Sequence, residues 1–208
     1  MRKLMFSILA VVVSVGAAGA TGSGKYPVCQ PAAKAIIDAR CVSSAEVAVN
    51  GDTPAAEVAC ADSAPGTNGI QQCIGAVKAM LSDSIDDAHQ SRIAAVACSG
   101  GSERLTIQGC MYSAQAVLNH DDTEAGRAMA AAIACSGGTD RNYIQHCISS
   151  AHAVTDSPSA WEQDLTAGFA CSGYTAESGS VQSCISRGGF EIKEKSRFQL
   201  IQDLIGVK

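Results

Sequence analysis

The chain has 208 residues, a formal net charge of −5 and ten cysteines, but only four Phe, four Tyr and one Trp. The negative charge argues against nucleic acid or an anionic membrane surface as the main partner. Small side chains bury little apolar area per residue, so packing alone would stabilise the fold only modestly, and the cysteines are the expected compensation.

The first 20 residues have the pattern of a secretory signal peptide. Arg2 and Lys3 precede an apolar run from Leu4 to Val15, and a stretch of small residues ends at Ala20. This pattern predicts cleavage after Ala20, and the apolar run is shorter than the roughly 20 residues that a transmembrane helix needs. We therefore expect an exported protein, periplasmic or secreted, without transmembrane anchoring and with a framework of disulfides.

A short phrase recurs every 37 residues in the rest of the chain. It consists of Ile or Val, then Gln, any residue and Cys, and it ends at Cys73, Cys110, Cys147 and Cys184. A second phrase, an apolar residue followed by Ala and Cys, ends 12 or 13 residues earlier, at Cys60, Cys98, Cys135 and Cys171. These phrases predict a repeat domain over residues 21–190, with a degenerate unit at 29–52 and four units at about 53–84, 85–122, 123–157 and 158–190.

Each unit is predicted to be a pair of helices. The first helix is rich in strong helix formers, and in three units it ends at a Ser-Gly step, where glycine can adopt the left-handed conformation. The second helix would begin at Asn68 or Asn142, and the Gln three positions later would complete a capping box. This capping role would explain why a glutamine recurs at Gln71, Gln108, Gln145 and Gln182, although Leu105 and Gly179 replace Asn at the cap position in two units.

The tail, residues 191–208, has Phe198, Ile201 and Ile205 on one helical face. Repeat arrays need a terminal element to cover the exposed core of their last unit, so we interpret this segment as a C-terminal capping helix. A docking or membrane-surface helix is the alternative.

Two disulfide registers are compatible with the cysteine spacing. In the first, cysteines pair across each turn within a unit, as Cys60–Cys73, Cys98–Cys110, Cys135–Cys147 and Cys171–Cys184. In the second, they pair across the longer polar loops, as Cys41–Cys60, Cys73–Cys98, Cys110–Cys135 and Cys147–Cys171. We favour the first because its spacing varies by only one residue and it leaves no unpaired cysteine at either end. Cys29–Cys41 then follows by elimination, although a helix between these two cysteines would hold them too far apart.

Sequence patterns typical of catalysis or metal binding are missing. The four histidines occupy different positions in the repeat; they are His89, His120, His146 and His152. No Cys-x-x-Cys occurs, and nucleophile-elbow, dinucleotide and phosphate-loop patterns are also absent. The serine of each Ser-Gly step is interpreted as a helix-end capping residue rather than a nucleophile. We therefore predict no catalytic residue, no metal and no cofactor.

These features predict an all-α fold of tandem, disulfide-stapled antiparallel helical hairpins, either an α-solenoid-like array or a compact bundle. The single Trp161 falls in the first turn of a predicted helix, where it either packs beneath a loop or anchors a partner. We expect a non-catalytic binding or scaffold protein of the bacterial envelope or exterior that contacts another protein or peptide through the repeat surface. The alternative is a secreted enzyme or enzyme inhibitor with a site in variable positions between units. A third class, a thiol-active or metal-storage protein, would require free thiols.

Overall fold

The computed structural model describes residues 26–31, 33–62, 67–101, 104–119, 123–175, 179–190 and 195–206. The predicted signal peptide lies outside these ranges. Within them the chain forms ten α-helices and three isolated antiparallel bridges, which confirms the predicted all-α class. The helices are α1 Ala39–Ala48, α2 Thr53–Cys60, α3 Thr67–Lys78, α4 Asp87–Cys98, α5 Arg104–Gln115, α6 Glu124–Cys135, α7 Ile144–His152, α8 Ala160–Cys171, α9 Val181–Ser186 and α10 Arg197–Leu204.

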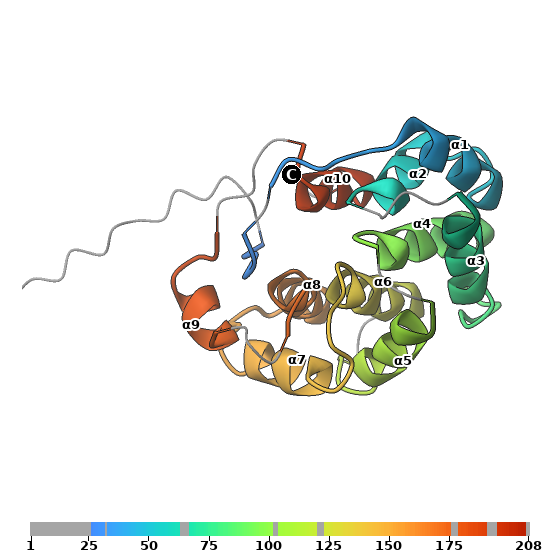
Figure 1. The fold of residues 1–208 in the computed structure, drawn as a ribbon. Helices are drawn as coiled ribbons and strands as arrows, with labels where there is room; N and C mark the ends of the chain where they lie inside the picture. The colour runs from blue at the N-terminus through green and yellow to red at the C-terminus, as the bar shows by residue number, and fades with distance from the viewer. Residues whose placement is uncertain are drawn as a thin grey trace, which may run out of the picture.

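The first nine helices lie in two rows that follow one arc (Figure 1). The inner row is α2, α4, α6 and α8, each packed against the next, and the outer row is α1, α3, α5, α7 and α9. Across the rows, the closely packed pairs are α1 with α2, α3 with α4, α5 with α6, and α7 with α8. Each packed hairpin therefore joins the second helix of one sequence unit to the first helix of the next.

The inner helices consist mainly of small residues because they are enclosed. In α6, Ala128 and every residue from 130 to 134 are at most 1 % exposed. Neighbouring helices approach closely here, since a Cβ added at Gly168 of α8 would lie 2.9 Å from the carbonyl oxygen of Ala130. Small side chains are thus what allows a helix to be packed on several sides at native density.

All ten cysteines form disulfides, and eight of them follow the register across the longer loops. Four pairs have Cα–Cα distances of 5.8 to 6.0 Å; they are Cys41–Cys60, Cys73–Cys98, Cys110–Cys135 and Cys147–Cys171. The preferred register across the turns within each unit is therefore wrong. The physical reason is that each such turn passes the chain from the inner row to the outer row, instead of folding the second helix back along the first.

The fifth disulfide joins Cys29 to Cys184, so the expected Cys29–Cys41 pair is also wrong. It connects the N-terminal segment to α9, across a separation of 155 residues. From this bond the segment runs extended across the ends of the inner helices, and we call its residues 26–31 and 33–37 the strap. Its backbone bridges are Val28–Phe190, Lys34–Ser196 and Ile37–Ala61. The strap therefore reaches from α9, at one end of the array, to the first hairpin.

The Ser-Gly steps link the inner helices to one another. The glycine N–H donates to a backbone carbonyl of the preceding unit, and the bonds are Gly100 to Ala61, Gly137 to Ser99 and Gly173 to Ser136, at 2.8, 3.0 and 3.1 Å. The hydroxyls of Ser99 and Ser136 donate to carbonyls at the ends of their own helices, as predicted for capping residues. The C-terminal ends of the inner row consequently lie side by side, and these helices run parallel.

Arg197, the first residue of α10, lies against this Ser-Gly ladder. Its guanidinium is buried, and Nη2 donates to Ser172 Oγ at 3.2 Å. Burial lowers the pKa of Arg197, while the nearby Asp62 carboxylate opposes that shift. A cation is favoured here because several helix C-termini concentrate their partial negative charge at the same place.

The recurrent glutamine links the outer helices rather than capping them. In three of the four units Nε2 donates to a carbonyl of the preceding outer helix, and the bonds are Gln71 to Ser44, Gln108 to Ala76 and Gln145 to Ser113, at 3.0, 3.1 and 3.3 Å. The expected capping box is therefore wrong, since these side chains are used between repeats. At α7 the cap residue is Tyr143, without a side-chain cap bond, and not Asn142.

A tail helix is present as α10, but it does not lie where we expected it. It packs mainly against α2, at the opposite end of the array from the last unit (Figure 1). Phe198 also reaches Phe169 of α8, with ring centroids 6.4 Å apart, and Phe169 stacks on Tyr26 of the strap at 5.4 Å. The reason is that the strap pairs with the chain just before α10 and guides it along the inner row.

Replacing Gly137 with Ala should reduce the free energy of unfolding by about 2–4 kcal/mol, because left-handed strain and overpacking would add. Gly137 has φ +75°, and an added Cβ would lie 2.1 Å from Arg197 Nη1. Gly138→Ala is the matched control, since Gly138 has φ +80° but open space around it, and it should cost only about 1 kcal/mol. Urea unfolding of both variants would measure this, and equal losses would contradict the close packing of Arg197.

Gln108→Ala should lower the free energy of unfolding by about 1 kcal/mol, because it removes one hydrogen bond between repeats. The control is Gln182→Ala, at the same repeat position in α9, where Gln182 is exposed and makes no hydrogen bond within the described part of the chain. Thermal unfolding followed by circular dichroism would compare the two. If both variants lost the same stability, the glutamines would not act through contacts between repeats.

Candidate functional site

A cavity of about 700 Å³ opens where the N-terminal ends of α4, α6 and α8 meet the C-terminal end of α10. Its apolar wall includes Ile93, Met129, Trp161, Leu204 and Ile205, and its polar edge includes His89, Arg92, Thr123 and Asp203. We call this cavity the Trp161 groove. Its volume lies in the range of small-molecule and side-chain binding pockets, which is about 300–1,000 Å³.

The N-terminal ends of the inner helices are held at one edge by side-chain caps. The caps are Asp52, Asp86, Thr123 and Ser159, which accept hydrogen bonds from backbone N–H groups in the first turns of α2, α4, α6 and α8. Each cap satisfies a donor that the helix itself leaves unpaired. Because the helices are parallel, residues from three different units meet in the groove.

Trp161 lies in the first turn of α8, as the sequence predicts, and it is half-buried against the core. Part of its indole therefore packs on the protein, and part remains open to the groove. The observed position of Trp161 is thus compatible with both alternatives, packing against the protein and contact with a partner.

The two basic side chains of the groove edge are bound to acidic neighbours. His89 Nδ1 lies 2.6 Å from Asp86 Oδ2, and Arg92 Nε donates to Asp52 Oδ2 at 3.0 Å. The backbone N–H and then the ring of His89 lower the pKa of Asp86 below its usual value. These contacts give the basic side chains local counter-charges, so the edge is not a free cationic patch.

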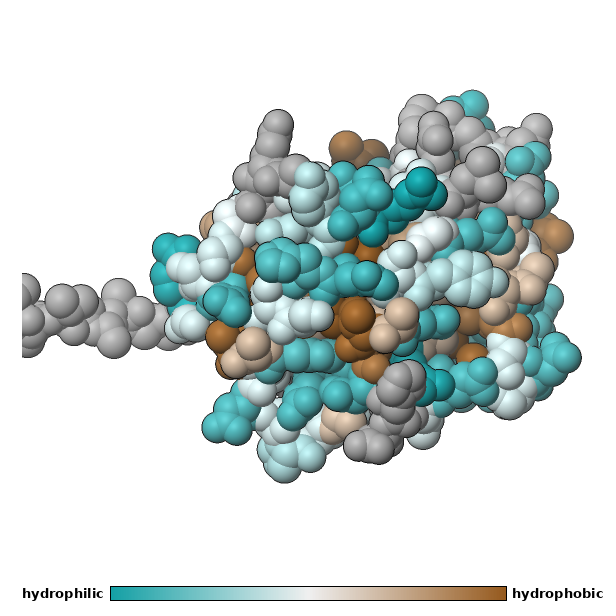
Figure 2. All heavy atoms as spheres, turned by 90° about the horizontal axis from the view of Figure 1, so that it is seen from below, coloured by the Kyte–Doolittle hydropathy of each residue, from teal (hydrophilic) through white to brown (hydrophobic). Residues whose placement is uncertain are grey.

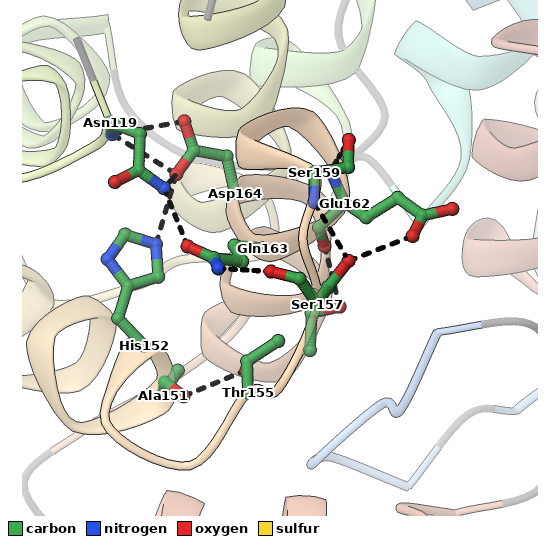
Figure 3. A network of polar contacts seen from close by, with 10 residues as sticks. Asn119, Ala151, His152, Thr155, Ser157, Ser159, Glu162, Gln163 and Asp164 are labelled. Carbon is green, nitrogen blue, oxygen red and sulfur yellow. Dashed lines mark hydrogen bonds and ion pairs between the residues drawn. The ribbon is translucent and has the colours of Figure 1, made fainter. Parts of the chain in front are cut away.

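A second polar cluster surrounds the fully buried Asp164 of α8 (Figure 3). Its carboxylate accepts hydrogen bonds from the backbone N–H of Asn119, at 3.2 and 3.1 Å, and from Asn119 Nδ2 at 3.0 Å. His152 Nε2 of α7 lies 3.0 Å from Asp164 Oδ1, although its orientation is poor for a hydrogen bond. The cluster therefore ties the α5–α6 connection and the end of α7 to α8.

This cluster does not have the arrangement of a catalytic triad. The nearby Ser157 hydroxyl donates to Glu162 Oε2 at 3.0 Å, on the far side of Gln163 from the His152 ring (Figure 3). Within the described residues, neither ring nitrogen of His152 bonds a serine, threonine or cysteine side chain. Its contacts are those of a structural network, because a buried carboxylate is stable only when its acceptor sites are filled.

The structure separates the residues that the sequence singled out. His89 lies at the Trp161 groove and His152 at the buried cluster, while His146 is exposed on α7 and His120 lies outside the described residues. Over the described ranges, no group of three or more His, Cys, Asp or Glu side chains is placed to hold a metal ion. The ten cysteines are all bonded, so the protein has no free thiol for thiol chemistry or metal storage.

The outer face gives a weaker indication of a binding site. Seen from the side of α5 and α7, hydrophobic residues form small separate areas among hydrophilic ones (Figure 2). Single exposed apolar residues, such as Tyr112, are normal on a soluble surface and need no partner. The Trp161 groove is therefore the stronger candidate for the functional site.

Comparison with known proteins does not add a function. No protein-family model, curated protein or solved structure matches this chain. In the helices described, none is long and apolar enough to span a bilayer. The interpretation of the site therefore rests on its geometry.

Asp164→Ala should lower the free energy of unfolding by about 2–4 kcal/mol, because Asn119 loses a charged acceptor and buried polar groups become unpaired. Asp156→Ala is the control: Asp156 is exposed in the loop before α8 and should change stability by no more than about 0.5 kcal/mol. Denaturant unfolding measures both. A small effect at Asp164 would show that the cluster is not a structural tie.

Proposed function

We propose that the protein is an exported, non-catalytic binding protein that holds a segment of another polypeptide in the Trp161 groove. The signal-peptide pattern and the five disulfides support export to the bacterial envelope or exterior, where disulfides persist. The proposal leaves both a periplasmic and a secreted location open.

The observation that carries this proposal is the composition of the groove. A half-buried Trp161 stands beside Met129, Leu204 and Ile205, and the polar groups are at the edge. A tryptophan in a pocket with an apolar floor and a polar rim is the arrangement typical of energetically dominant contacts in protein interfaces. The volume of about 700 Å³ is enough for one or two large side chains.

The disulfides support binding by a preformed surface. Each packed hairpin is crosslinked, and the fifth bond attaches the strap to α9. A site whose backbone is already fixed loses less conformational entropy when a partner binds. Met129 and Trp161 also offer polarizable surfaces that tolerate differently shaped partners.

A displayed random-peptide library, selected on the folded and oxidised protein, would test the proposal. We expect enriched peptides whose affinity falls about thirtyfold or more on Trp161→Ala, since hot-spot aromatics contribute about 2 kcal/mol or more. Trp161 is the single tryptophan, so its fluorescence should also shift when a synthetic copy of such a peptide binds.

The matched control is Tyr112→Ala, which removes an aromatic side chain that is 62 % exposed on α5 of the outer row. It should leave the affinity for these peptides unchanged. Selection of no peptide, or of peptides that bind Trp161→Ala as well as the parent protein, would rule out the groove as the functional site.

A further inference from the structure

Asp203 is the charged residue of the Trp161 groove that has no charged partner among the described residues. Its Oδ1 accepts a hydrogen bond from the neutral amide of Gln199 at 2.9 Å, and its side chain is exposed. By contrast, His89 and Arg92 are each paired with a carboxylate of this chain. The groove therefore contains one uncompensated negative charge.

The dipole of α10 does not favour an acid at this position, although the hydrogen bond from Gln199 four residues earlier offsets part of the cost. Asp203 is the second-last residue of the helix, where its charge faces the partial negative charge of the helix C-terminus. Such a placement is unfavourable, whereas Asp52 and Asp86 lie at helix N-termini, where an acid is favourable. Asp52 and Asp86 thus cap helix N-termini, whereas the structural contact of Asp203 among the described residues is the single hydrogen bond from Gln199.

The neighbours of Asp203 suit the two parts of a basic side chain. Trp161, Met129 and Leu204 provide an apolar surface for the methylene groups of lysine or arginine. The Asp203 carboxylate provides the counter-charge for the cationic head, and the indole face adds attraction for a cation. An apolar wall and an acid without a charged partner together favour a side chain that has both an apolar stem and a cationic head.

We infer that the groove recognises a lysine or arginine side chain of the partner polypeptide, with Asp203 as the residue that selects its charge. This inference rests on the proposed function, since it assigns the partner chemistry of the same groove. The net charge of −5 also favours a basic partner, because it speeds the encounter with an oppositely charged segment. An acidic partner is the rival outcome, which Arg92 would support only by giving up its bond to Asp52.

The test uses the peptides from the library selection whose binding depends on Trp161, together with variants of these peptides. We expect the selected pool to be enriched in Lys and Arg, and replacement of the basic residue by Leu should weaken binding to the parent protein about tenfold. With the Asp203→Asn protein, the same replacement in the peptide should change the affinity less than twofold, since the carboxylate that pairs with the basic residue is gone. Asp203→Lys should move the selected pool towards Asp and Glu, and binding to the parent protein should weaken with added salt.

Asp156→Asn is the matched control, because it removes the same charge from an exposed loop that does not line the groove. Trp161-dependent peptides without an excess of Lys and Arg would overturn this inference and leave the proposed function standing. The inference would also be overturned, with the proposed function left standing, if the Leu replacement lowered the peptide's affinity equally for the parent protein and for Asp203→Asn. Absence of any Trp161-dependent peptide would instead remove the proposed function, and this inference with it.

Discussion

The disulfide between Cys29 and Cys184 is the constraint on which the rest of the structure depends. In the chain-entropy model, a bond that closes 155 residues restricts the unfolded chain by about 5 kcal/mol, compared with about 3.5 kcal/mol for the bonds that close 25 residues. More importantly, it is the bond that joins the strap to α9, the last helix of the outer row. The strap can then run along the C-terminal ends of the inner helices and pair with the first hairpin.

This closure determines where α10 lies, and α10 determines the groove. The strap pairs with Ser196, and Arg197 is then buried against Gly100 and Gly137 at the C-terminal ends of the inner row. Because α10 starts there and runs to the opposite edge, its last residues, including Asp203, reach the N-terminal ends of α4, α6 and α8. The two edges of the array thus differ. Backbone pairing and the buried Arg197 close the edge formed by the C-terminal ends of the inner helices, whereas the edge formed by their N-terminal ends is open as a pocket.

The repeat made the helical class and the structural role of the cysteines predictable, but not the way the helices pair. The nearly constant spacing between pairs such as Cys60 and Cys73 was compatible with a bond within each unit. Spacing along the chain, however, does not show which of two neighbouring helices lies closer in space. The same limit applies to Gln108, whose recurrence was correctly recognised as structural and wrongly assigned to capping. A hydrogen bond to the preceding repeat has no local signature, because its acceptor is a backbone carbonyl that any residue supplies.

The groove was less predictable than the fold because its residues do not recur. Trp161, Met129 and Arg92 come from three units, and Asp203 comes from the tail. Met129 and Arg92 occupy the same repeat position, but they are chemically different residues, so comparing the units with one another does not single out any of the four. In a repeat array, recurring residues are those that every contact between units needs, whereas a site formed once must use residues that differ between units. A residue that is both unique and unfavourable for its own helix, as Asp203 is, combines these two signals. This combination, rather than recurrence, is the feature by which a binding site in such an array can be recognised before its partner is known.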